Sequence, residues 1–269
     1  MLDWICPVCG KSLMQAGGSL RCESGHCFDV AKQGYVNLLL NNQPGYKRHG
    51  DDKRMVRARR AFLSKGYYQP VLDGVLDLLR SRLTPGGLIV DAGCGEGWYT
   101  RGVADLAAEL DCRVCGVDIS RDAVAMAAKS GGGAYAVASA ARLPLAEDSC
   151  RAVLNLFSPL EAGEYGRVLV PGGWLLRAIP LPRHLFSLKA AIYDKPYEND
   201  LPDPTLPGFC LVETLDIRDT LHLEDPEDIR SLFAMTPYYY KTGAADQAKL
   251  DALDRLDTEL EVRLLCYRK

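Results

Sequence analysis

The chain has 269 residues, of which 48% are hydrophobic and 25% charged, and these are ordinary values for a globular protein with a full-sized core. The formal net charge of −3 excludes a uniformly basic, nucleic-acid-coating surface but allows local basic patches. No apolar run approaches the ~20 residues that span a bilayer, and the N-terminus lacks signal-peptide features, so we expect a cytoplasmic protein with no membrane segment.

A cluster of cysteines opens the chain. Four of the ten cysteines (Cys6, Cys9, Cys22 and Cys27) lie in the first 27 residues, and in a reducing compartment a metal site explains them better than disulfides do. With His26 they give the spacing C-x2-C-x12-C-x3-H, which is typical of a closed, tetrahedral structural zinc site. His26 and the adjacent Cys27 compete for the fourth position, and we favour His26.

Three regions follow from the pattern along the chain. Residues 1–40 form the expected zinc-binding module, residues 41–83 a basic connector and a helix, and residues 84–269 a larger α/β domain. Within the second region, apolar residues recur at helical spacing from about 61 to 83.

From residue 84 onward, strand patterns alternate with helical patterns. This alternation predicts a doubly wound, mostly parallel sheet with Rossmann-like topology. Strands are expected at 88–90, 112–117, 134–138, 152–157 and 174–179, with helices at 99–110, 121–129 and 161–170. After a proline-rich excursion, further strands are expected at 211–223 and 260–267, and further helices at 226–235 and 244–258.

A glycine loop follows the first strand of this domain directly and opens a helix. Its sequence is Asp91-Ala-Gly93-Cys-Gly95-Glu-Gly97-Trp-Tyr99-Thr100. Glycines let a ligand approach the main chain, and such sheets bind ligands at the carboxyl ends of their strands. Asp118 ends the next strand, where an acid can accept hydrogen bonds from both ribose hydroxyls. A dinucleotide fingerprint requires glycine at the position of Trp98, so the loop instead resembles motif I of the class I methyltransferases, which wraps the amino-acid part of S-adenosylmethionine.

Two later loops are consistent with the same prediction of a methyltransferase cofactor site. Residues 139–145 follow the third strand, where the methyltransferase loop passes the adenine ring. Residues 155–159 end the fourth strand, where these enzymes place residues that face the reacting methyl group. Each segment is also compatible with an ordinary polar loop.

The order of parts resembles that of the RlmA-type large-subunit ribosomal RNA guanine-N1 methyltransferases over nearly the whole chain. The more specific segments precede motif I: Ala31-Lys-Gln-Gly-Tyr-Val-Asn-Leu38, Arg59-Arg-Ala-Phe-Leu63 and Gly66-Tyr-Tyr-Gln-Pro70. Segments 171–174, 182–184 and 235–237 agree as well.

The resemblance and the motif together imply the site residues. Zinc ligands are expected at Cys6, Cys9, Cys22 and His26. Contacts to S-adenosylmethionine are expected from Tyr68, Asp91, Gly93, Gly95, Gly97, Tyr99, Thr100, Asp118 and His184. No motif in the sequence identifies a general base, so no catalytic residue is predicted.

The implied function is methyl transfer to N1 of a guanosine in a hairpin of 23S ribosomal RNA, and the resemblance also implies a homodimer. A basic segment fits an RNA partner, because residues 47–60 carry seven Lys or Arg and two Asp, a net 7 − 2 = +5. Tyr46, Tyr67 and Tyr68 are candidates for stacking on unpaired bases. Two alternatives stay open: a small-molecule methyltransferase with a structural zinc module, and a non-catalytic zinc RNA-binding protein.

Overall fold

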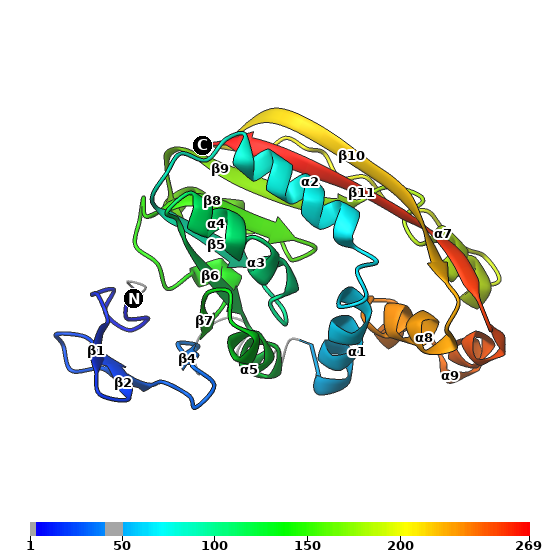
Figure 1. The fold of residues 1–269 in the computed structure, drawn as a ribbon, viewed down its shortest axis with the longest axis horizontal. Coiled ribbons are helices and arrows are strands. Elements are labelled where there is room, and N and C mark those ends of the chain that lie inside the picture. Colours follow the sequence, from blue (N-terminus) through cyan, green and yellow to red (C-terminus); the bar gives the residue numbers. More distant parts are fainter. Residues whose placement is uncertain (1–3, 41–50) are drawn as a thin grey trace.

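The structure is a computed structural model that describes residues 4–40 and 51–269, and within them the strands form two sheets (Figure 1). The smaller sheet is antiparallel and belongs to the N-terminal module. It contains β1 (Met14–Ala16), β2 (Ser19–Arg21) and β3 (Cys27–Asp29). The larger sheet has the strand order β10-β11-β9-β8-β5-β6-β7-β4.

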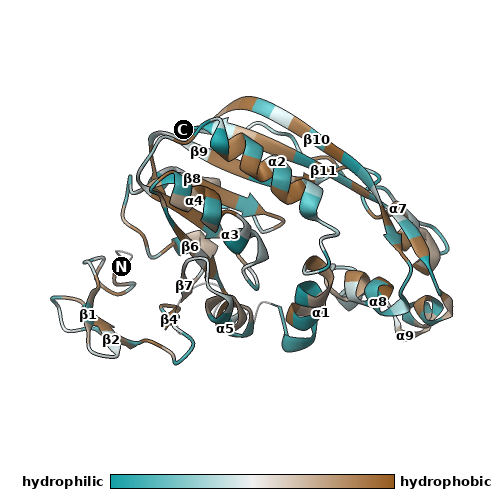
Figure 2. Cartoon of the chain, in the orientation of Figure 1, coloured by the Kyte–Doolittle hydropathy of each residue, from teal (hydrophilic) through white to brown (hydrophobic). Residues whose placement is uncertain are grey.

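The larger sheet is mostly parallel, as predicted. Its strands are β4 (Val36–Asn37), β5 (Leu88–Ala92), β6 (Arg113–Asp118), β7 (Ala134–Val137), β8 (Cys150–Leu156), β9 (Leu169–Pro180), β10 (Cys210–Leu223) and β11 (Leu256–Arg268). Every pairing from β4 to β9 is parallel, whereas β11 pairs antiparallel with both β9 and β10. The central strands are mostly apolar (Figure 2), as expected for a parallel sheet with helices on both faces. Strand β5 is buried along its whole length.

Helices connect and cover these strands. They are α1 (Lys53–Leu63), α2 (Gln69–Arg80), α3 (Trp98–Gly102), α4 (Ala104–Glu109), α5 (Arg121–Ser130), α6 (Ala162–Val168), α7 (Phe186–Ile192), α8 (Pro226–Ala234) and α9 (Ala244–Gln247). Helices α1 and α8 lie side by side (Figure 1). None of the helices in the described ranges is long and apolar enough to cross a membrane.

Several expected boundaries differ from those observed. The helix expected at 61–83 starts earlier, at Lys53, and is divided into α1 and α2 near Gly66, whose φ of +82° suits glycine. The helix expected at 99–110 is divided at Val103. The helix expected at 244–258 is wrong beyond residue 252, since the chain enters β11 at Leu256. Pairing with β10, which begins at Leu256 opposite Leu223, favours the strand there, and a local pattern cannot reveal that pairing.

The N-terminal module packs directly on the α/β domain. Strand β4 extends the large sheet by pairing with β7, with Val36 opposite Ala136. Trp4 and Leu13 of the module share a buried apolar cluster with Leu143 of the domain. The module is therefore held against one edge and one face of the sheet by hydrogen bonds and apolar contacts.

Candidate metal and cofactor sites

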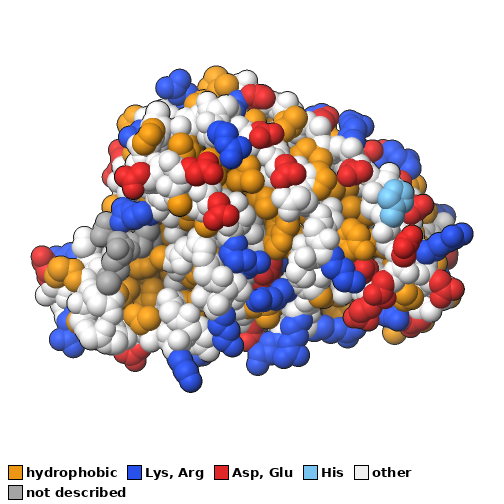
Figure 3. All heavy atoms as spheres, in the orientation of Figure 1, with side chains coloured by type: hydrophobic (Ala, Val, Ile, Leu, Met, Phe, Trp, Pro, Cys, Tyr) orange, Lys and Arg blue, Asp and Glu red, His pale blue; other side chains and the backbone are white. Residues whose placement is uncertain are grey.

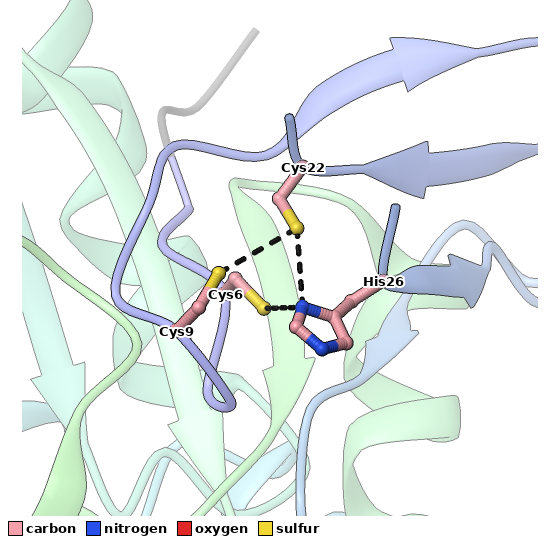
Figure 4. A group of neighbouring side chains, drawn as sticks. All are labelled: Cys6, Cys9, Cys22 and His26. Atoms are coloured by element: carbon pink, nitrogen blue, oxygen red, sulfur yellow. Dashed lines mark hydrogen bonds between the residues drawn. The ribbon is translucent and has the colours of Figure 1, made fainter. Parts of the chain in front are cut away.

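The N-terminal module brings three thiols and one imidazole together (Figure 4). The potential ligand atoms of Cys6, Cys9, Cys22 and His26 all lie within 4.8 Å of one another. Cys9 Sγ lies 3.6 Å from Cys22 Sγ, and His26 Nδ1 lies 3.3 Å from Cys22 Sγ and 3.6 Å from Cys6 Sγ. The fold thus brings the four residues of the sequence motif together in one compact cluster.

These distances fit a tetrahedral zinc site. Zn–S bonds of about 2.3 Å and Zn–N bonds of about 2.0–2.1 Å at tetrahedral angles separate ligand atoms by roughly 3.6–3.8 Å. A backbone hydrogen bond from Lys11 lowers the pKa of the Cys9 thiol to about 6, which favours the thiolate that binds metal. Cys27, the competitor of His26, is exposed on β3 and lies outside the cluster. The residues present therefore fit one zinc ion with His26 as the fourth ligand.

A cavity of about 1030 Å³ opens at the carboxyl ends of β5, β6 and β8. Its volume is at the upper end of the ~300–1,000 Å³ that small-molecule sites occupy. Six of the nine predicted cofactor residues line it: Tyr68, Gly93, Gly95, Tyr99, Asp118 and His184. Residues of both later loops line it as well: Ser139, Ala140, Ala141, Phe157, Ser158 and Pro159.

The other three predicted cofactor residues lie behind the glycine loop rather than on the cavity wall. Asp91 and Thr100 are buried, and Thr100 Oγ1 donates a 2.6 Å hydrogen bond to Asp91 Oδ2. Burial raises the pKa of Asp91 to about 7. Gly97 has a φ of +82°, and an added Cβ would lie 2.8 Å from Ala127 Cβ. These three residues therefore shape the loop from beneath.

Asp118 connects the second strand of the site with the glycine loop. Its carboxylate accepts hydrogen bonds from the backbone N–H groups of Gly95, at 2.9 Å, and Ser120, at 2.7 Å. The side chain lines the cavity, and burial raises the pKa of Asp118 above its usual value. An acid in this position can hold the loop and still present lone pairs to the hydroxyls of a ribose.

Tyr68 and His184 form a buried polar pair in the cavity wall. The backbone N–H of Glu261 donates to His184 Nδ1 at 3.2 Å, which places the ring proton of the neutral imidazole on Nε2. Nε2 lies 3.3 Å from Tyr68 Oη and donates to it. The hydroxyl hydrogen of Tyr68 is then directed elsewhere, and the cavity lies beside it. Burial lowers the pKa of His184 to about 3, so the ring stays neutral.

Two polar groups of the glycine loop are buried without a hydrogen-bond partner. In the part of the chain that the structure describes, the Tyr99 hydroxyl and both Glu96 carboxylate oxygens make no hydrogen bond, although a Glu96 oxygen lies 3.6 Å from Arg101 Nη1. Both residues line the cavity. Buried polar groups are costly unless a partner satisfies them, so their presence fits a polar ligand in the cavity. The donors and acceptors of this wall suit the charged amino-acid part and the ribose of S-adenosylmethionine.

Part of the expected RNA-binding segment belongs to the cavity instead. Arg59 of α1 lines the wall, forms an ion pair with Asp51 and donates to the Met235 carbonyl oxygen at 3.4 Å. Tyr68 is buried, so it is not a surface platform for bases. Tyr67 stacks on a core ring and donates to Asp228 at 2.8 Å.

Many wall residues were not predicted as cofactor contacts from the sequence, among them Met55, Arg59, Arg177 and Tyr238. They come from α1, from β9 and from the segment after α8, and tertiary packing brings them together. The resemblance covers segments 59–63 and 235–237, and the basic segment 47–60 includes Met55 and Arg59, but neither signal indicated a contact with the cofactor. Tyr46, Lys47 and Arg48 of the basic segment lie outside the described residues.

Comparison with known proteins supports both sites. Residues 4–43 match the family model of the RlmA N-terminal zinc ribbon, and residues 89–173 match a methyltransferase domain model. These matches confirm the predicted zinc-binding module and the predicted class I methyltransferase fold.

Three relatives span most of the chain. The 23S rRNA (guanine(748)-N(1))-methyltransferase of Streptomyces fradiae is 34% identical over 244 residues, covering 86% of this chain and 84% of its own length. A Micromonospora griseorubida protein named for guanine-N1 methylation of 23S rRNA is 37% identical, covering 68% of this chain and 67% of its own. A Bacillus subtilis protein, YxjB, named for the same reaction, is 28% identical over 98% of this chain and 96% of its own.

Proposed function

We propose that this chain, which belongs to the 23S rRNA (guanine-N1) methyltransferase family, transfers a methyl group from S-adenosylmethionine to N1 of a guanosine in a hairpin of 23S rRNA. The main support for the proposal is the presence of two sites in one chain. One is the cavity where Asp118 meets the glycine loop, and the other is the cluster of three cysteines and one histidine.

The cavity residues would orient the cofactor and the base. S-adenosylmethionine, when bound, supplies a methyl group activated by its positive sulfur. Asp118 would hold the ribose hydroxyls, and the glycine loop from Gly93 to Gly97 would hold the amino-acid part. Because the cofactor carries its own activation, alignment of N1 with the methyl group would be the main contribution of the protein.

The guanine must lose its N1 proton during transfer. His184 is engaged at both ring nitrogens, so it is not available as a base. The cavity is also lined by the carboxylates of Asp51, Glu96 and Glu161, of which Asp51 is paired with Arg59. We assign no general base among them.

The zinc module would serve structure and recognition. Cys6, Cys9, Cys22 and His26 fill all four positions of a tetrahedral ion, so no open position is left for a substrate. Because β4 of the same module pairs with β7, zinc binding would stabilise the edge of the sheet as well.

Helix α1 offers a basic surface for RNA phosphates. Lys53, Arg54, Arg57 and Arg60 are exposed along it. Figure 3 shows Lys and Arg side chains gathered along the lower edge of the molecule, in the region of α1 and α5. Such a surface beside the cavity would position a hairpin by its backbone while one base enters the site. A homodimer and a cytoplasmic location also remain part of the proposal.

Transfer of labelled methyl from S-adenosylmethionine to unmodified 23S rRNA tests the function. Label in RNA supports the proposal. Label only in a small molecule would favour the metabolite alternative, and hairpin binding without turnover would favour the non-catalytic alternative.

A further inference from the structure

Phe157 has a left-handed backbone conformation and an exposed side chain that lines the cavity. It directly follows β8, has a φ of +60° and leaves 42% of its surface exposed. A left-handed conformation is uncommon for a bulky residue, and strained residues cluster at functional sites. An exposed phenylalanine that lines a cavity also retains an unused apolar surface.

Hydrogen bonds on both sides of Phe157 hold this conformation. The amide of Asn155, a fully buried side chain, donates to the carbonyl oxygens of Ser158, at 3.1 Å, and Pro159, at 3.0 Å. Ser158 Oγ in turn donates to the Ala92 carbonyl oxygen at 2.6 Å, which ties the loop to the end of β5. The backbone conformation of Phe157 is therefore held by its neighbours before any ligand binds.

The ring of Phe157 lies beside three other rings that line the cavity. Tyr68 meets it edge-on, with centroids 6.1 Å apart and an interplanar angle of 73°. Tyr99 is tilted by 39° at 6.4 Å. His184 is nearly parallel, at 17°, with centroids 6.4 Å apart. These separations are at the wide end of the ~4.5–7 Å range of aromatic pairs, so none of these three rings covers the Phe157 ring in a close stack.

We propose that Phe157 is the platform on which the extruded target guanine stacks. The inference rests on the proposed function and deepens it by naming the residue that receives the base. Enzymes that modify a base hold it by stacking on aromatic or apolar side chains after it leaves the helix. A phenylalanine ring suits this role because stacking needs a flat apolar face and no hydrogen bond. Phe157 also lies at the end of β8, next to the glycine loop that would hold the cofactor.

A double-mutant cycle between protein and RNA tests the contact. The RNA is the 23S rRNA hairpin that contains the guanosine methylated by the wild-type enzyme, and its partner carries an abasic nucleotide at that position. Binding of both hairpins is measured with S-adenosylhomocysteine present, which cannot donate a methyl group. The variants are Phe157→Asn, which tolerates a left-handed backbone without a ring, and Phe157→Tyr, which keeps the ring. Val212→Asn on β10 is the matched surface control.

In the wild type, removal of the base should weaken binding by about 5- to 150-fold, which corresponds to ~1–3 kcal/mol for one stacked base. In Phe157→Asn the two hairpins should bind within about twofold of each other, while Phe157→Tyr and Val212→Asn should keep most of the difference. An unchanged difference in Phe157→Asn overturns the stacking role, as does a variant whose only defect is weaker cofactor binding. Methylation of 23S rRNA by the wild type is measured first. If the wild type methylates no 23S rRNA, the proposed function itself is overturned.

Discussion

Asp118 Oδ2 accepts a 2.9 Å hydrogen bond from the backbone N–H of Gly95, a residue 23 positions earlier in the chain. The acid that ends β6 therefore fixes the middle of the glycine loop that follows β5. The same carboxylate also accepts from the Ser120 N–H at the start of α5. Three segments of the cavity consequently depend on one side chain.

Asp118→Ala should weaken binding of S-adenosylmethionine by at least about tenfold, because hydrogen bonds to a charged group contribute ~1.5–3 kcal/mol. Calorimetric titration of the folded variant measures this change. Asp118→Asn keeps one acceptor oxygen and should fall between the wild type and the alanine variant. Unchanged affinity in a folded Asp118→Ala protein would remove this residue from the site.

Cys9→Ser should release zinc and lower the stability of the N-terminal module, because the ion supplies much of the folding free energy of so small a unit. Metal content by mass spectrometry should fall from one zinc per chain toward zero. Cys27→Ser is the matched control, since Cys27 is exposed and lies outside the cluster. Loss of zinc in the control, with retention in Cys9→Ser, would show that the ligand set is wrong.

His184 should make stability depend on acidity. Its folded pKa of about 3 lies below the ordinary value of 6.5, so the stability contributed by the neutral ring is present above about pH 6.5 and is lost as pH falls toward 3. The loss has a limiting slope of ~1.4 kcal/mol per pH unit. Urea unfolding at pH 7 and pH 5 should show a larger decrease for the wild type than for His184→Gln. Equal decreases would mean that this ring is not held neutral by burial.

Arg57→Glu should weaken binding of a 23S rRNA hairpin and reduce its salt dependence. Arg57 is exposed on α1, and each phosphate contact contributes about 0.7–0.9 to the slope of log affinity against log salt. Binding measured at several salt concentrations checks this, with cofactor affinity as the internal control. An unchanged slope would place the RNA on another surface.

The fold was largely predictable because its signals are local. Strand β5 reads as an apolar run followed by glycines, and Asp118 closes the next strand at the expected position. The error at residues 253–258 has a non-local cause. The sequence there is compatible with a helix. In the fold, β10 pairs with β11 from Leu256 onward and β9 pairs with it from Val262 onward, and both partners are 30 or more residues away in the chain.

The site was predictable only in part, because some of its contacts join segments that are distant in the sequence. The glycine loop and the spacing of Cys6, Cys9, Cys22 and His26 can be recognised within short segments of the sequence. The loop that contains Phe157 is held by a hydrogen bond from Ser158 to Ala92, and Arg59 is held in the cavity wall by Asp51 and Met235. These contacts form only in the folded chain. No spacing in the sequence encodes them.

The identity of the methylated nucleoside tests the proposed function directly. Unmodified 23S rRNA is incubated with the purified protein and S-adenosylmethionine, digested to nucleosides and analysed by mass spectrometry. We expect 1-methylguanosine at about one per rRNA molecule, absent without cofactor and strongly reduced with Asp118→Ala. Methyl groups on another base or another atom of guanine, or none at all with cofactor bound, would contradict the proposed function.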